Sequence, residues 1–285
     1  MHVSIAGSID QAVDRAKEKG CDTFQIFTRN PRGWKFGDLE KEETAAFAKK
    51  VKTYRIHPPI AHMPYLPNLA SPNDELYEKS VGSLIEDVRR CGSLKVPYLV
   101  LHLGSHMGAG MKVGFERITG ACGRALKTVR NDVTLVLENT AGQKNSMGST
   151  LEDLAHILEN LDKGRTAVCL DTCHAFGAGY DLRSSKAVDH LFKRFDETVG
   201  LDRLKVVHLN DSKGELGCGL DRHEHIGLGF IGEKGFRSLL HHPEVQDLPM
   251  ILETPIDAKR DDAGNLSKIR ELARSSQLIP VDRKL

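Results

Sequence analysis

The segment YLVLHLGSH (residues 98–106) contains a short apolar run that ends in a histidine, and similar runs return along the chain. They are closed by His, Asp or Glu at PIAHM (59–63), TLVLENT (134–140), AVCLDTCH (167–174), LKVVHLND (204–211) and MILETP (250–255). Short runs rich in Val, Ile and Leu and bounded by loops are typical of parallel strands that are buried on both faces. The repetition indicates that polar side chains from successive strands gather on one shared rim.

Eight strand candidates alternate with amphipathic helical patterns. The strands are expected at 2–6, 23–27, 60–62, 98–103, 134–138, 167–171, 205–209 and 250–254. Eight β/α units in 285 residues match a TIM barrel, whereas a doubly wound open sheet usually serves its ligand from two or three strands. We therefore predict an α/β fold, a single-domain TIM (β/α)8 barrel over residues 1–285. Its segment from about residue 257 is expected to pack outside the barrel or to trail from it.

The charge of the chain is nearly balanced. The 40 Lys and Arg residues and 39 Asp and Glu residues give a net charge of +1, which argues against a broadly basic surface for nucleic acid. A local patch remains open, because the segment Arg29–Lys35 places three cations around Trp34. The six cysteines form no CxxC pair and are expected to be buried thiols.

The sequence contains no apolar run of the roughly 18 residues that a membrane helix requires. The start, MHVSIAGSIDQ, lacks the basic and apolar regions of a signal peptide. We therefore expect a cytoplasmic protein with no membrane partner. A barrel that binds its substrate on one face gives no reason to require a dimer, so a monomer is expected.

Nine residues are candidate metal ligands, and nearly all of them lie at the end of a predicted strand. They are His62, His102, Glu138, Asp171, His174, His208, Asp221, His223 and Glu253. Imidazoles with carboxylates suit Zn²⁺, Mn²⁺ or Fe²⁺ better than Mg²⁺ or Ca²⁺. Because zinc takes about four ligands and a catalytic site leaves one position open, nine ligands with one bridging carboxylate would supply three ions.

Two pairs of these ligands are close in sequence. Asp171 with His174, and Asp221 with His223, are expected to form local chelates. Cys169 flanks Asp171, as does Cys173, so a thiolate ligand is an open alternative. The remaining histidines in helix-like or loop segments are expected to have no role at the site; they include His57, His156, His190, His241 and His242.

Taken together, these segments resemble the endonuclease IV family, the zinc-dependent apurinic/apyrimidinic (AP) endonucleases of DNA base-excision repair. The matching segments are HVSIAG, AHMPYLPNLASP, VLHLGSH, LVLENTAGQ, CLDTCHAFGAGYD, VVHLNDSKGELGCGLDRHEHIGLGFIG and ILETP. They extend from residue 2 to residue 255, and the stretch from Val207 to Gly232 is long and specific.

The resemblance implies a cluster of three zinc ions. It assigns His62 and His102 to a first zinc, with Glu138 bridging to a second. The second site is completed by Asp171, His208 and Glu253, and the third is formed by His174, Asp221 and His223. Mn²⁺ or Fe²⁺ could take the place of zinc at some sites.

The resemblance also implies the reaction and the substrate. Glu253 would orient or deprotonate a water that the metals activate, and Glu138 would serve the same centre. The phosphodiester 5′ to an abasic site would be hydrolysed, leaving a 3′-hydroxyl and a 5′-deoxyribose phosphate. The implied partner is double-stranded DNA with abasic sites or blocked 3′ ends, from which blocking groups would also be removed.

Reaching a sugar inside a duplex requires side chains that enter the base stack. The resemblance assigns this role to Arg32 and Tyr65, on loops after the second and third predicted strands. Gly33 departs from the family pattern, in which a longer polar residue is expected beside the arginine, so the details of wedging are open.

Two other functions remain as alternatives. A sugar isomerase or epimerase with a xylose-isomerase-like barrel also ends its strands in Glu, Asp and His around one or two divalent ions. Such an enzyme would not need His174, Asp221 and His223. A lesion-binding protein without catalysis is the second alternative, and the complete ligand set argues against it.

Overall fold

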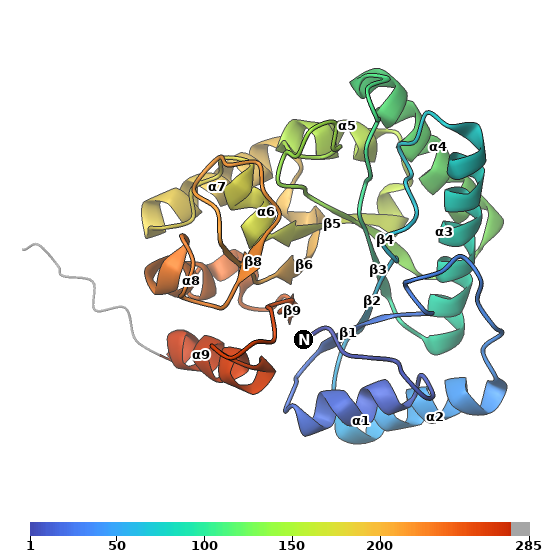
Figure 1. The fold of residues 1–285 in the computed structure, drawn as a ribbon, viewed down its shortest axis with the longest axis horizontal. Helices are drawn as coiled ribbons and strands as arrows, with labels where there is room; N and C mark the ends of the chain where they lie inside the picture. Colours follow the sequence, from blue (N-terminus) through green and yellow to red (C-terminus); the bar gives the residue numbers. More distant parts are fainter. Residues whose placement is uncertain (275–285) are drawn as a thin grey trace, which may run out of the picture.

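The computed structural model describes residues 1–274, in which seven parallel strands form one curved sheet in the order β1-β2-β3-β4-β5-β6-β9. Their bounds are β1 (Phe24–Phe27), β2 (Pro59–His62), β3 (Tyr98–Leu101), β4 (Thr134–Glu138), β5 (Thr166–Asp171), β6 (Leu204–His208) and β9 (Met250–Ile251). Each pair of neighbouring strands is parallel. Figure 1 shows helices around the outside of this sheet, so the predicted TIM barrel is confirmed.

The N-terminal segment completes the ring between β1 and β9. The amide of Val3 donates to the carbonyl of Gln25 on β1 at 2.8 Å. On its other side, the amide of His2 donates to the carbonyl of Leu252, just after β9, at 3.2 Å. Figure 1 places the N-terminus beside these two strands. The segment therefore takes the position of the eighth strand of the barrel.

This segment is shorter than the strand predicted at 2–6, since only His2 forms a β-bridge, to Gln25. The chain leaves the sheet at Ser4, where the guanidinium of Arg15 binds two backbone carbonyls. The distances are 2.8 Å to Ser4 and 2.6 Å to Ala6. These carbonyls are satisfied by a side chain instead of by a neighbouring strand, so regular pairing ends there.

The helices follow the strands, as the β/α pattern predicts. They are α1 (Gln11–Glu18), α2 (Lys41–Tyr54), α3 (Asp74–Leu94), α4 (Met111–Thr128), α5 (Leu151–Glu159), α6 (Thr172–Gly177), α7 (Ser185–Thr198), α8 (Gly232–Leu240) and α9 (Asp262–Arg274). Single 3₁₀ turns lie at Lys163–Arg165, Leu201–Arg203 and Pro243–Val245. A small hairpin of β7 (Asp211–Ser212) and β8 (His223–Glu224) follows β6. Within residues 1–274, no helix is both long and apolar enough to span a membrane.

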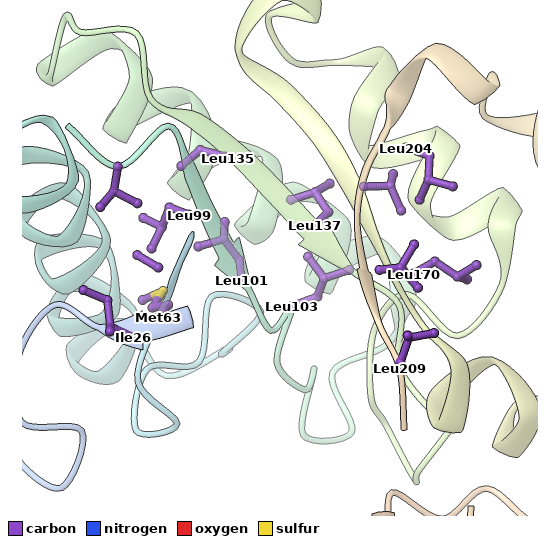
Figure 2. Close-up of a cluster of buried hydrophobic side chains, with 14 of the residues drawn as sticks. Ile26, Met63, Leu99, Leu101, Leu103, Leu135, Leu137, Leu170, Leu204 and Leu209 are labelled. Atoms are coloured by element: carbon purple, nitrogen blue, oxygen red, sulfur yellow. The ribbon is translucent and has the colours of Figure 1, made fainter. Parts of the chain in front are cut away.

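The strands are buried on both faces, and alternate residues enter two different cores. The inner core fills the barrel with Ile60, Val100, Val136, Ala167, Cys169, Val206 and Ile251. The outer core lies between strands and helices, and Figure 2 shows side chains of this layer, such as Leu135 and Leu137. Because each strand carries both kinds of residue in alternation, its register fixes which side chain at its end points into the mouth of the barrel.

The segment after residue 257 forms α9, which packs beside α8 on the outside of the barrel. Asp262 at its start pairs with Lys19 at 2.8 Å, and Leu272 is fully buried. Residues 275–285 of the predicted trailing segment lie outside the described part of the chain. That residues 1–285 form a single domain stays a prediction.

All six cysteines are free thiols, as predicted, and five are buried. Cys218 is the exception, since it is only half-buried.

Candidate metal centre

The register of the strands determines the direction in which six of the nine predicted ligands point. Each lies two residues after a member of the inner core, in the pairs Ile60–His62, Val100–His102, Val136–Glu138, Cys169–Asp171, Val206–His208 and Ile251–Glu253. Residues two apart on a strand share a face, so these side chains continue the inner face at the C-terminal end of the barrel. The inward register therefore brings them together at the mouth.

Glu138 at the end of β4 lies at the centre of this group and is fully buried. Its Oε2 is 3.1 Å from His62 Nε2 and 3.1 Å from His102 Nδ1. Its Oε1 is 2.8 Å from His208 Nδ1. One oxygen of this carboxylate thus faces two imidazoles and the other faces a third, which is the arrangement that a bridging ligand requires.

The second set gathers around His208 Nδ1. This atom is 3.4 Å from Glu253 Oε2 and 3.8 Å from Asp171 Oδ2. One ligand atom each from Glu138, Asp171, His208 and Glu253 lies within 4.8 Å of the others. That spacing could hold one metal ion between four protein ligands.

The third set lies outside the strands of the barrel. Asp221 Oδ1 lies 3.2 Å from His174 Nε2 and 3.4 Å from His223 Nε2. His174 comes from α6, and His223 begins β8 of the hairpin. The fold thus brings all nine predicted ligands into three neighbouring groups.

Asp171 and His174 also form a hydrogen bond with each other. Asp171 Oδ1 accepts a hydrogen bond from the backbone amide of His174 at 2.9 Å and caps the N-terminus of α6. The other oxygen, Oδ2, faces His208 and His223. The spacing of three residues therefore also reflects a helix cap, and the predicted local chelate stays a prediction.

Hydrogen bonds fix which nitrogen of each imidazole faces the centre. Nδ1 of His62 lies 2.7 Å from the Met63 carbonyl, and Nδ1 of His174 lies 2.9 Å from the Asn139 carbonyl. A carbonyl only accepts, so these nitrogens carry the proton and leave Nε2 as a ligand atom.

The same rule orients two further rings. Nδ1 of His223 lies 3.0 Å from the Glu253 carbonyl, so its Nε2 is left as the ligand atom. In His208 the order is reversed, because Nε2 lies 2.9 Å from Gln25 Oε1 and Nδ1 faces the carboxylates.

Two of these nitrogen atoms indicate whether the residues can bind a metal ion. Nε2 of His174 and Nε2 of His223 are buried and have no hydrogen-bond partner among the described residues, although Asp221 is near both. A buried imidazole nitrogen without a partner is costly unless it binds an ion. The donor set of imidazoles and carboxylates fits Zn²⁺, Mn²⁺ or Fe²⁺.

The charges at the centre are strongly coupled. Burial alone would raise the pKa of Glu138, but His102 and His208 outweigh it and hold this pKa well below its usual range. Burial lowers the pKa of His174, but Asp171, Asp221 and Glu138 outweigh it and raise this pKa to about 10, so a metal ion that binds Nε2 must displace a proton from the ring. The carboxylates therefore stay ionised and provide the negative charge that cations need.

Cys169 also lies close enough to Glu138 and His208 to join a metal site. Burial raises the pKa of its thiol to about 12. Because the thiolate is the form that binds metals, the thiol is a poor ligand at neutral pH. Cys173 likewise lies close to Asp221 and His223, so the thiolate alternative stays an untested prediction for both cysteines.

Sequence reasoning missed three amides that support the ligands. Gln25 is fully buried inside the barrel and contacts His208 and Glu253. Asn210 donates to Asp171 Oδ2 at 2.6 Å and accepts from the backbone amide of Glu253 at 2.8 Å. Asn139 accepts from the amide of Asp171 at 2.7 Å. A signal was present, since Gln25 is the one polar residue within the otherwise apolar run FQIF (24–27).

The two residues predicted to contact DNA lie at the same face as the ligands. Tyr65 is 69% exposed, and its ring centroid is 6.1 Å from that of His102. It lines a cavity of about 310 Å³ together with His62, His174 and Glu253. Arg32 is exposed and lines a neighbouring groove on the other side of His2.

The patch predicted at Arg29–Lys35 is smaller than expected. Arg29 is buried and its Nε lies 3.1 Å from the buried carboxylate of Asp87. Its guanidinium also donates to the carbonyl of Gly33 at 3.2 Å. Arg29 therefore holds the loop from within, and only Arg32 and Lys35 present their charges at the surface.

Comparison with known proteins defines the class first. The family model described as xylose isomerase-like TIM barrel matches residues 13–276. A crystal structure of a D-tagatose 3-epimerase-like protein has a TM-score of 0.71 at 17% identity and covers 95% of this chain and 97% of its own, which shows the shared fold. The chain is thus a xylose-isomerase-like barrel.

Proteins with higher sequence identity show the family within this class. A probable endonuclease 4 of Methanoculleus marisnigri is 58% identical over 274 residues, covering 95% of this chain and 97% of the relative. One from Nitrosopumilus maritimus is 52% identical over 275 residues, covering 95% and 98%. The crystal structure of endonuclease IV from Thermus thermophilus has a TM-score of 0.85 at 38% identity and covers 95% of this chain and 97% of its own. The chain belongs to the endonuclease IV family and is a hydrolase of the nuclease type.

Proposed function

We propose that this protein is a DNA-repair enzyme that hydrolyses the phosphodiester 5′ to an abasic site in double-stranded DNA. The products are a 3′-hydroxyl and a 5′-deoxyribose phosphate. The observation that carries the proposal is the position of Glu138, whose two oxygens face different imidazole sets at the barrel mouth. Membership in the endonuclease IV family supports the same reaction.

The residues present suit three metal ions, for which zinc is the best match. His62, His102 and Glu138 would hold the first; Glu138, Asp171, His208 and Glu253 the second; and His174, Asp221 and His223 the third. Zinc, when bound there, supplies Lewis-acid stabilisation of charge on a phosphate and lowers the pKa of water towards neutrality.

Glu253 is the residue best placed to orient the attacking water and to take its proton. Its Oε1 accepts a hydrogen bond from Gln25 Nε2 at 2.6 Å, which fixes the carboxylate in the cavity. Burial would raise the pKa of Glu253, but the charge of His208 outweighs it and holds this pKa well below its usual range. The carboxylate is therefore ionised, which suits it to accept hydrogen bonds from the attacking water and to orient it.

Tyr65 and Arg32 support DNA as the substrate. An abasic nucleotide costs least to displace from the stack, because it has no base to unpair, and side chains that enter the gap offset the cost. Tyr65 is exposed beside the ligands, and its neighbour Leu66 is also exposed. The same centre would remove blocking groups from 3′ ends, because their release is also phosphoester hydrolysis.

The deciding experiment is incubation of the metal-loaded protein with a duplex that holds one abasic site. We expect incision at the bond 5′ to that site, loss of activity with a strong chelator, and no cut in an undamaged duplex. Absence of site-specific incision would overturn the proposal.

Metal content separates this function from a sugar epimerase. About three zinc ions per chain are expected, and a single manganese would contradict the proposal. His62→Ala should lower both zinc content and activity. His190→Ala is the matched control, since His190 is an exposed imidazole on α7.

A further inference from the structure

His2 lies beside the metal centre but belongs to none of its ligand groups. Its Nδ1 is 3.1 Å from Gln25 Nε2 and 3.5 Å from Glu253 Oε1. Its ring packs on Phe27 with a centroid distance of 4.4 Å. The backbone of His2 is also fixed, because its amide donates to Leu252 across the barrel closure. The imidazole is therefore held in one orientation.

The orientation of the Gln25 amide determines which ring nitrogen of His2 carries the proton. Gln25 Oε1 accepts from His208 Nε2 at 2.9 Å, and Gln25 Nε2 donates to Glu253 Oε1 at 2.6 Å. The reverse orientation would place the amide oxygen against the carboxylate. The second amide hydrogen is then available to His2 Nδ1, which acts as an acceptor.

A neutral imidazole that accepts at Nδ1 carries its proton on Nε2. This Nε2 is buried and has no hydrogen-bond partner among the described residues. His2 lines the cavity of the metal centre, and it also lines the groove that contains Asn30 and Arg32. The ring of His2 thus lies where these two hollows meet, and one of its nitrogens lacks a partner.

We propose that His2 is a substrate-binding residue whose Nε2–H donates to a phosphate oxygen of the damaged DNA strand. The proposal rests on the proposed function, because that function brings a phosphodiester to the cavity. A strand that passes from the groove of Arg32 to the metal centre must cross His2. Phosphate oxygens are the acceptors that a nucleic-acid backbone presents at such a crossing.

Three variants of His2 distinguish a direct contact with the substrate from an indirect role in which His2 positions Glu253. His2→Ala removes the ring. His2→Asn keeps an oxygen that can accept from Gln25 near the position of Nδ1 but lacks the outer donor. His2→Gln reaches farther and restores an N–H near the position of Nε2. We expect His2→Asn to raise the KM for an abasic duplex about 10-fold, with wild-type zinc content, and His2→Gln to recover most of the loss.

The partner phosphate can be located with duplexes that carry one uncharged methylphosphonate at a time. At one position near the abasic site, the methylphosphonate should weaken DNA binding by the wild type about 10-fold. The same methylphosphonate should weaken DNA binding by His2→Asn less than about 2-fold.

Two results would overturn the proposal. The first is that the effects of His2→Asn and of the methylphosphonate on binding add up at every position of the duplex. The second is that His2→Asn loses zinc, which would mean that His2 acts by holding Glu253 in place. Failure of the wild type to incise the abasic duplex would instead reject the proposed function. The outcomes are therefore distinguishable.

Discussion

Glu138 Oε1 lies 2.8 Å from His208 Nδ1 across the mouth of the barrel, although the two residues are 70 positions apart in the sequence. Because the other oxygen of Glu138 faces His62 and His102, this carboxylate joins two imidazole sets. We expect Glu138→Gln to lose metal from both sets and to lower kcat/KM for abasic DNA by at least about 10³-fold. Metal analysis and incision kinetics would check this. Unchanged zinc content would contradict the bridging role.

Glu253 should be needed for the chemical step more than for binding. Glu253→Gln keeps the shape of the side chain but removes the charge that accepts a proton. We expect kcat to fall about 10²–10⁴-fold, while the Kd for an abasic duplex stays within about 3-fold of wild type. Single-turnover rates and binding titrations measure the two effects. A variant that cuts at the wild-type rate would show that the assigned role is wrong.

Arg29 and Arg32 are three residues apart but should have different functions. Arg32→Ala should weaken DNA binding and reduce the slope of log Kd against log salt by about 1, without changing stability. Arg29→Met should destabilise the fold by about 3–5 kcal/mol, because it leaves the buried carboxylate of Asp87 without its paired positive charge. Urea unfolding and salt-dependent binding separate the two. Equal effects of both variants on the salt slope would contradict the assignment.

Asp211 should fix the loop that follows the hairpin. Its carboxylate accepts hydrogen bonds from the backbone amides of Gly227, Gly229 and Ile231 at 2.9 to 3.0 Å. Asp211→Asn replaces one acceptor by a donor that faces these amides, so we expect a loss of about 2–3 kcal/mol. Hydrogen exchange should show faster opening at 227–232. Unchanged exchange in this loop would show that the carboxylate is dispensable.

Lys50 should make stability depend on pH at the packing of α1 against α2. Its Nζ lies 2.6 Å from Asp10 Oδ2 and also contacts Asp14. Burial raises the pKa of Asp10, but the hydrogen bond from Lys50 outweighs this and lowers it. A carboxylate with a depressed pKa stabilises the fold at neutral pH, and this stabilisation is lost as the pH falls through the depressed value.

Lys50→Met should therefore cost about 0.5–1 kcal/mol at pH 7. This difference from wild type should shrink as the pH falls below about 4. Urea unfolding with a chelator present throughout excludes metal loss as a cause. Lys49→Met is the matched control, because Lys49 is exposed on the same helix. A Lys50→Met effect of equal size at pH 2.5 and pH 7 would contradict the mechanism.

The sequence by itself determined the barrel and the identity of its polar rim. Runs such as TLVLE (134–138) carry both signals, because alternation by two places Val136 inside the barrel and Glu138 at its mouth. Strand identity, the order of β/α units and the residues that end the strands therefore follow from local pattern.

Only the tertiary structure decided how these side chains are used. Arg29 stands in a cationic segment, yet it is buried against Asp87 from α3, a contact that no local pattern encodes. The unused Nε2–H of His2 depends on an amide from β1 and a carboxylate after β9. Periodicity reports the face on which a residue lies, whereas its partners depend on segments that are brought together only when the barrel closes.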